Sequence, residues 1–156
     1  MRPSWRRFQR LSPLERSFFL RAVCLLPVTA CALRFVGWRE IRYLLGSRGA
    51  QCVAQGRGDA AEKWRIADAA ARMTEAASRY GIVRGKCLSK SIVICRLLHA
   101  QGLQATVQVG GRKEGRLFEA HAWVEIEGRT INDSEQVRQR FVPFGGQVSG
   151  ALTRDE

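Results

Sequence analysis

The chain has 156 residues, of which 46% are hydrophobic, so it is long enough for a domain with an apolar core and too hydrophobic for general disorder. Its formal net charge of +12 predicts attraction to polyanions, but no aromatic array or recognition motif accompanies the basic residues, which argues against nucleic acid as a partner. The five cysteines form no CxxC pair and no secretory signal precedes them, so we expect a cytoplasmic protein with free thiols, no metal ion and no cofactor.

Residues 1–58 are predicted to form a basic, helical N-terminal segment that ends in a glycine-rich connector. The sequence SPLE at residues 12–15 has the form of a capping box, in which a serine and a glutamate satisfy each other's backbone N–H groups. A helix is therefore expected to begin at Pro13 and to kink or end at Pro27, because proline removes a backbone donor. Residues 35–45 are expected to form a second helical piece.

The N-terminal segment is also apolar enough to raise the question of membrane contact. Its longest uncharged apolar run, residues 22–33, is shorter than the roughly 20 residues that span a bilayer. Docking of residues 16–45 on a partner or on a membrane surface remains an alternative, with membrane contact the less favoured of the two. Cys24 and Cys31 are expected to be buried as small apolar residues.

Residues 59–156 are predicted to form the core, in which two helices come first. The first helix begins at Asp59, carries apolar residues at steps of three and four, and ends at Gly81 in a left-handed conformation. The second helix begins at Cys87 and ends by Gly102. These helices provide an apolar stripe for packing and place a cysteine at a helix start.

Strand-like runs fill the next part of the core. A polar turn is expected at residues 110–116 and a tight turn at Glu127 and Gly128. The expected strands are residues 104–109, 117–126 and 129–133. Helices followed by hairpin-connected strands predict an α+β fold.

Cys87 is the candidate nucleophile. Free backbone N–H groups and the dipole at a helix start favour a thiolate, and they can also stabilise an oxyanion. Arg84 and Lys86 add positive charge nearby in sequence. His121 is the candidate base, because it stands in the strand-like run AHAWVE between small residues that let a partner side chain approach. The second histidine, His99, lies near a helix end and is expected to be a surface or capping residue.

The candidate orienting residue follows the turn at Glu127 and Gly128. If this turn has two residues, positions whose numbers sum to 255 pair, so that Asn132 shares the face of His121 and Asp133 points away. A bulged turn shifts the sum to 256 and places Asp133 on the face of His121. Carboxylate and amide groups can both orient the histidine of a cysteine enzyme. We predict Asp133 on a bulged hairpin, with Asn132 as the alternative.

Together these motifs resemble the transglutaminase-like cysteine proteases that remove leader peptides in lasso-peptide biosynthesis, in the short stand-alone form of their B proteins. The resemblance covers about residues 60–140, together with a basic, helical N-terminal part. It is carried by CLxxS at residues 87–91, AHAWVE at residues 120–125, Gly128, and ND at residues 132–133. Each motif alone is weak, whereas the combination is specific.

This resemblance implies a Cys-His-Asp catalytic triad at Cys87, His121 and Asp133. It implies a papain/transglutaminase-like fold, in which the helix that bears the cysteine packs on a small antiparallel sheet. The implied activity is hydrolysis at the leader–core junction of a lasso-peptide precursor. The implied partners are a small leader-recognition protein supplied in trans and an ATP-dependent cyclase.

Two other functions stay open on the sequence alone. The same triad could transfer the acyl group to an amine, as in a cross-linking transglutaminase. The fold could also serve as a non-catalytic peptide-binding module.

Overall fold

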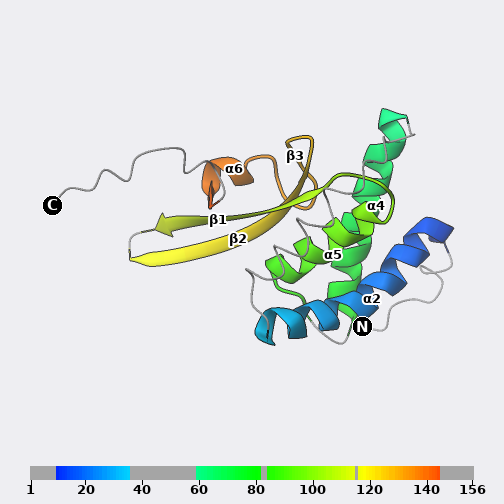
Figure 1. Cartoon of the computed structure of the whole chain (residues 1–156), viewed down its shortest axis with the longest axis horizontal. Helices are drawn as coiled ribbons and strands as arrows, with labels where there is room; N and C mark the ends of the chain where they lie inside the picture. The colour runs from blue at the N-terminus through cyan, green and yellow to red at the C-terminus, as the bar shows by residue number, and fades with distance from the viewer. Residues whose placement is uncertain (1–9, 36–58, 82–83, 115, 145–156) are drawn as a thin grey trace.

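The structure, a computed structural model, describes residues 10–35, 59–81, 84–114 and 116–144. Its elements are α2 (Pro13–Phe35), α4 (Ala60–Tyr80), α5 (Cys87–His99), β1 (Thr106–Glu114), β2 (Leu117–Ile126), β3 (Arg129–Thr130), α6 (Val137–Arg140) and β4 (Val142–Pro143). The strands form one antiparallel sheet in the order β3-β2-β1-β4. In Figure 1 the β1–β2 hairpin projects beyond the three long helices, and α6 lies across the hairpin from α5. The α+β fold class is confirmed.

Helix α2 begins where the sequence predicts. The backbone N–H of Ser12 donates to Glu15 Oε2 at 2.8 Å, and the N–H of Glu15 donates to Ser12 Oγ at 3.3 Å. The capping box is therefore formed. Of the two outcomes expected at Pro27, a kink or an end, the end is wrong, because the helix continues to Phe35. One missing backbone donor is outweighed by the packing of α2 on α4 and α5.

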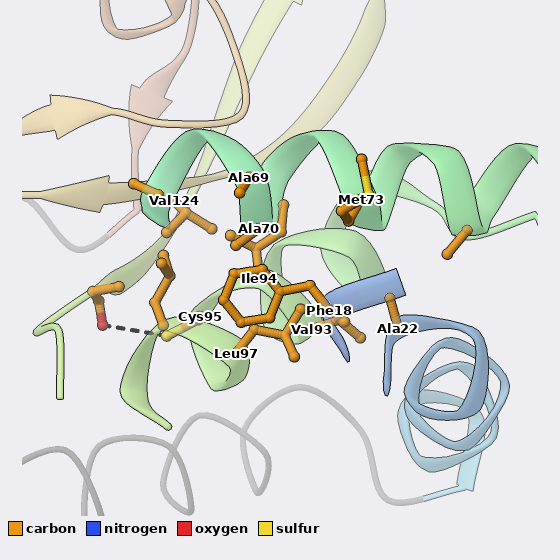
Figure 2. Close-up of a cluster of buried hydrophobic side chains, with 14 of the residues drawn as sticks. Phe18, Ala22, Ala69, Ala70, Met73, Val93, Ile94, Cys95, Leu97 and Val124 are labelled. Carbon is orange, nitrogen blue, oxygen red and sulfur yellow. Dashed lines mark hydrogen bonds between the residues drawn. The ribbon is translucent and has the colours of Figure 1, made fainter. Parts of the chain in front are cut away.

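The main core joins α2, α4, α5 and β2. Phe18 of α2 lies among side chains of α4 and α5, and Val124 of β2 closes the cluster (Figure 2). Predominantly small residues on α4, with Met73 among them, allow the three helices to approach closely. The buried apolar residues of this core are Phe18, Ala22, Leu26, Ala67, Ala69, Ala70, Met73, Ala77, Val93, Ile94, Cys95, Leu97, Leu98, Ala105, Val124 and Ile126.

The outer face of α2 corrects two expectations. Cys24 and Cys31 are exposed rather than buried, and Phe35 on the same helix is 82% exposed. Helix α2 has 23 residues and contains an 18-residue window with a mean hydropathy of 1.7, so it is the one helix in the described ranges that could cross a membrane by length and composition. The uncharged run of residues 22–33 is only part of this helix, so the run alone underestimates the length that could cross a bilayer. A core helix of a soluble protein passes the same test, and one face of α2 does belong to the core.

Two expectations for the N-terminal segment fall outside the described residues. These are the second helical piece, of which only Phe35 is described, and the glycine-rich connector. The division of the chain after residue 58 remains a prediction for the same reason.

Helix α4 lies between Asp59 and Gly81, as the sequence predicts, but the conformations of its two caps differ from the expectation. Asp59 occupies the N-cap position without a side-chain hydrogen bond to the helix. Gly81 is extended rather than left-handed, with φ −82° and ψ 178°, and its N–H donates to the Ala77 carbonyl at 2.7 Å. A Cβ atom at Gly81 would collide with that carbonyl oxygen. Glycine is therefore required here by close backbone approach, and not by a positive φ.

Strand β1 is longer than the sequence predicts. It runs through Gly110 and Gly111 to Glu114 and pairs with β2 along its whole length, so most of the expected polar turn is strand. A Cβ atom at Gly110 would lie 2.9 Å from the ring of Trp123. Large side chains of neighbouring strands thus fill the space above the glycines, which explains why a glycine-rich sequence holds a strand here.

The turn between β2 and β3 has two residues. Glu127 and Gly128 have φ values of 49° and 80°, and Glu125 pairs with Thr130. These positive φ values match a tight hairpin turn. The bulged hairpin predicted from the sequence is therefore wrong, and β3 ends at Thr130 rather than at residue 133.

The end of α5 is tied to the start of β1 through one carbonyl. Cys95 Sγ donates to the Ala105 carbonyl at 3.2 Å, and His99 Nε2 lies 2.7 Å from the same oxygen. Because Cys95 is buried, desolvation raises the pKa of its thiol from 9.0 to about 12. This thiol stays neutral at physiological pH.

We predict that Cys95 makes the stability of the protein fall at alkaline pH. Between about pH 9 and pH 12 the unfolded thiol is deprotonated while the folded thiol stays protonated, so the free energy of unfolding falls by about 1.4 kcal/mol per pH unit from this group. Urea unfolding at several pH values should show a shallower fall for Cys95→Ala than for the wild type. Cys31→Ala, at an exposed site, is the control and should follow the wild type. Parallel curves for all three proteins would contradict the assignment.

Candidate active site

Cys87 occupies the first turn of α5 and is partly buried. Lys86 is the N-cap residue and provides no side-chain cap, and the first turn contains no acidic residue. Within the part of the chain that the structure describes, neither the N-cap nor the first turn thus provides a side-chain acceptor for the backbone N–H groups at this end of the helix. An anion at this position is favoured by the N–H groups and by the helix dipole.

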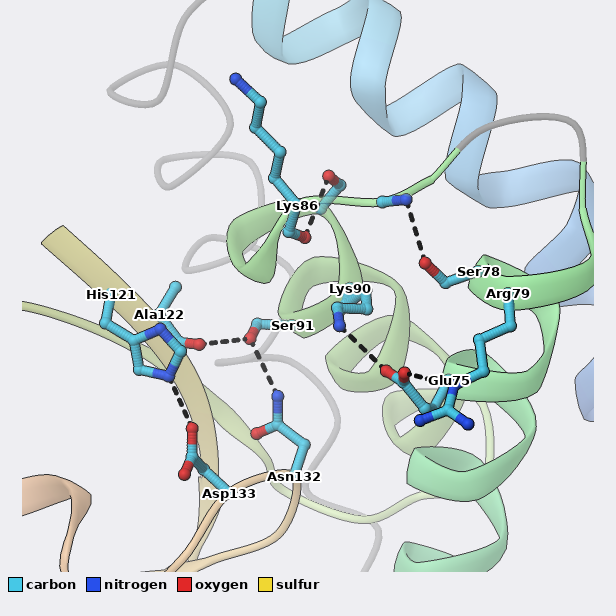
Figure 3. Close-up of polar contacts among 12 residues, drawn as sticks. Glu75, Ser78, Arg79, Lys86, Lys90, Ser91, His121, Ala122, Asn132 and Asp133 are labelled. Atoms are coloured by element: carbon cyan, nitrogen blue, oxygen red, sulfur yellow. Dashed lines mark hydrogen bonds and ion pairs between the residues drawn. The ribbon is translucent and has the colours of Figure 1, made fainter.

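Ser91 connects the helix of Cys87 to the strand of His121. Ser91 Oγ donates to the Ala122 carbonyl at 3.1 Å, and Asn132 Nδ2 donates to Ser91 Oγ at 3.2 Å (Figure 3). Ser91 is fully buried and lies one helical turn after Cys87, on the same side of α5. Cys87 therefore lies one helical turn, or roughly 6 Å along the helix axis, before the residue that binds Ala122, the neighbour of His121 in β2.

Helix α5 runs alongside β2 in the same direction. Ser91 contacts Ala122 in β2. Cys95, one turn later in α5, contacts Ala105, which lies directly before the β1 residue that pairs with Glu125, farther along β2. Cys87 therefore lies toward the beginning of β2. Among the described residues no hydrogen bond joins the Cys87 thiol to His121.

His121 and Asp133 are in direct contact. His121 Nε2 lies 2.6 Å from Asp133 Oδ2, and the two side chains are 25% and 28% exposed. The backbone N–H of Ser134 donates to Asp133 Oδ1 at 2.7 Å and holds the carboxylate in place. A carboxylate only accepts hydrogen bonds, so it keeps the proton on Nε2 and leaves Nδ1 as the basic nitrogen.

Asp133 reaches His121 although the hairpin has the register that was expected to turn it away. The regular pattern continues for one further bond, from the N–H of Ile131 to the Val124 carbonyl. After this bond a side chain replaces the backbone of the partner strand: the N–H of Val124 donates to Asn132 Oδ1 at 2.7 Å. The chain then leaves the strand, so face alternation no longer applies at Asp133. Asn132, the alternative orienting residue, contacts Ser91 and Val124 instead.

The His121 face of the sheet is stabilised by a buried charge. Trp123 Nε1 donates to Glu125 Oε1 at 2.7 Å, and Arg138 binds both oxygens of the same carboxylate. Burial raises the pKa of Glu125, but the hydrogen bonds from Arg138 and Trp123 outweigh it and leave the pKa below its usual value. The ring of Trp123 stacks near His121 at 6.3 Å between centroids, and Phe141 lies 5.0 Å from His121.

Sequence reasoning missed the residues that join the site together. Ser91 was visible as the last residue of CLxxS, and its spacing from Cys87 placed it on the same helix face. Glu125 was likewise visible as the last residue of AHAWVE, but its pairing with Arg138 carried no signal, because an ion pair between distant positions depends on the folded arrangement.

Comparison with known proteins identifies the family. The Transglutaminase-like superfamily matches residues 14–145. The chain belongs to this superfamily. A curated relative, the microcin J25-processing protein McjB of Escherichia coli, is 32% identical over 60 residues, which are 38% of this chain and 28% of McjB. The match thus spans less than a third of that relative's length. No solved structure matches.

We predict that Asn132 stabilises the junction of α5, β2 and the loop that carries Asp133. Asn132→Ala leaves the N–H of Val124 without its acceptor and Ser91 without its donor, so the free energy of unfolding should fall by about 1–3 kcal/mol. Gln139→Ala, at an exposed position nearby, is the control and should change it by about 0.5 kcal/mol or less. Equal urea midpoints for the two variants would show that the junction is unimportant.

Proposed function

We propose that this chain is a cysteine peptidase that removes the leader peptide from a ribosomally made lasso-peptide precursor. Membership of the transglutaminase-like superfamily and the similarity to a microcin J25-processing protein support the proposal. The observation that carries it is the hydrogen bond between His121 and Asp133, next to the strand residue that binds the helix of Cys87. Such a pair is what a cysteine nucleophile needs as a base with fixed orientation.

In the proposed reaction Cys87 attacks the carbonyl carbon at the leader–core junction. His121 Nδ1 accepts the thiol proton, and the oxygen of the tetrahedral intermediate is stabilised by N–H groups at the start of α5. His121 then returns the proton to the departing amine, which leaves as the new N-terminus of the core peptide. The leader remains bound to Cys87 as a thioester.

Water completes the cycle. His121 takes a proton from the water molecule that attacks the thioester, and the thiol leaves with that proton, so the enzyme returns to its starting state. Asp133 does not exchange a proton in these steps. It holds the imidazole with Nε2 protonated, so that Nδ1 can act as the base in both halves of the reaction.

The proposal includes two protein partners in the cytoplasm. In this proposal a separate leader-recognition protein presents the precursor to the peptidase. A cyclase would use the amine that cleavage releases.

A second candidate reaction is acyl transfer, which the superfamily name itself favours. The thioester at Cys87 would then react with an amine in place of water. The side chains of the site serve both reactions equally, because the difference lies in which nucleophile reaches the thioester.

The test is cleavage of a synthetic lasso precursor, with and without a leader-binding protein, followed by weighing of the products. Cys87→Ala should abolish cleavage, and Asp133→Ala should slow it by about 10²- to 10⁴-fold, because Nε2 of His121 then has no acceptor that fixes the tautomer. Cys24→Ala and Cys31→Ala, at exposed positions on α2, are the controls and should cleave like the wild type.

Three results of this experiment bear on the assignment. Cleavage that survives in Cys87→Ala would remove the proposal. A labelled amine in the same reaction would appear on the leader if acyl transfer dominates. Tight binding of the precursor without any product would indicate a peptide-binding module.

A further inference from the structure

The sheet surface that carries α5 continues beyond the helix. Even-numbered side chains of β2 point to this surface, where Val124 belongs to the core and Ala122 is buried. Ala120 and Phe118, farther along the same face, are exposed, and Phe118 is 65% exposed. Because α5 begins with Cys87 at this end, the uncovered part of the sheet starts next to the candidate nucleophile.

Two aromatic rings form a flat apolar surface on this uncovered part. Phe118 and Phe144 are stacked with ring centroids 6.1 Å apart, and Phe144 is 57% exposed. We call this pair the aromatic ledge. Both rings rest on Gly111, where a Cβ atom would lie 2.5 Å from Phe118 and 2.7 Å from Phe144. The ledge therefore depends on a glycine in β1, and it leaves two large apolar surfaces open to solvent.

Among the described residues, the backbone of Ala120 has no strand partner at the outer edge of β2, the edge that faces β3. The N–H and C=O of Val124 both bind partners on the β3 side, so the backbone groups of Ala122, Ala120 and Phe118 point the same way by alternation. The Ala122 carbonyl accepts from Ser91. In the described part of the chain, no residue pairs with Ala120 on this side. An extended segment could therefore add to this edge as a strand.

We propose that the outer edge of β2 at Ala120, together with the aromatic ledge, binds the peptide substrate in an extended conformation. Backbone hydrogen bonds to Ala120 would set the direction of the peptide, and a bulky apolar side chain of the substrate would rest on Phe118, whose ring is supported by Phe144 from the β4 side. This inference rests on the proposed function. The occupant follows from continuity, because the edge and the ledge continue the face of β2 that Ser91 contacts at Ala122, one helical turn after Cys87.

The ledge makes a chemical class of substrate favourable. Burying an apolar side chain of the substrate on the ring of Phe118 releases water from both surfaces, whereas a small or charged side chain gains nothing there. The substrate should therefore carry a large aliphatic or aromatic residue within a few positions of the cleaved bond. A substrate without a large apolar residue at this position should show a higher KM and little change in the maximum rate of cleavage.

The experiment compares Phe118→Ala and Phe144→Ala with Leu117→Ala. Leu117 is also exposed, at 77%, and belongs to the same hairpin, but its odd position turns it to the opposite face. With a synthetic lasso precursor, each ledge variant should lower kcat/KM by about tenfold through a higher KM, and Leu117→Ala should stay within about twofold of the wild type. Far-ultraviolet circular dichroism checks that all three variants are folded.

Replacing the large apolar residues of the precursor by alanine, one at a time, sharpens the test. One replacement should cost the wild type about tenfold and cost Phe118→Ala almost nothing, because the contact is already lost. If every replacement costs the wild type and Phe118→Ala equally, or if Leu117→Ala is as impaired as the ledge variants, the ledge does not bind the substrate.

Failure of the proposed function gives a different result. The binding of the fluorescently labelled precursor is measured with Cys87→Ala alone and with Cys87→Ala combined with each ledge or control substitution. A precursor that is never cleaved, yet binds about tenfold more weakly when Phe118 is replaced, would contradict the peptidase while supporting the ledge. Unchanged or absent binding in this assay would overturn the ledge itself.

Discussion

The hydroxyl group of Ser91 is the point on which the site depends. It donates to the Ala122 carbonyl of β2 and accepts from the amide of Asn132, so it joins a helix, a strand and a loop in one buried place. Ser91 is fully buried, and an unsatisfied polar group in that position costs about 1–3 kcal/mol. The three elements that carry Cys87, His121 and Asp133 are therefore held together by hydrogen bonds whose loss would lower the free energy of unfolding.

Two clusters support this junction from opposite faces of the sheet. On one face the main core packs α5 against Val124, with α2 and α4 behind it. On the other face Trp123 is buried with Phe141, and the Glu125 carboxylate is held by Arg138. The strand of His121 is thus confined between packed layers, and its position does not depend on the polar contacts alone. Beyond these layers the hairpin is exposed, which leaves room for a substrate.

The sequence predicts elements that depend on local chemistry and misses those that depend on distant neighbours. The capping box of α2, the start of α5 at Cys87 and the bounds of β2 follow from nearby residues, and the structure has them as predicted. The glycines of β1 resembled a loop because the aromatic rings that cover them come from other parts of the chain. The contact of Asp133 with His121 was anticipated for the wrong reason, since a bend after β3 produces it and not a bulge. Ser91 and Asn132 form their bonds only once three elements have packed, so spacing could indicate one of them at most.

The central claim is that Cys87 and the pair of His121 and Asp133 form a single chemical unit. The most direct measurement is the rate at which iodoacetamide alkylates Cys87 at neutral pH, followed by mass spectrometry of its peptide, in the wild type and in His121→Ala. A base within reach of the thiol speeds alkylation, so the variant should react about tenfold more slowly at Cys87, with no change at Cys24. Equal rates at Cys87 in the two proteins would contradict the account.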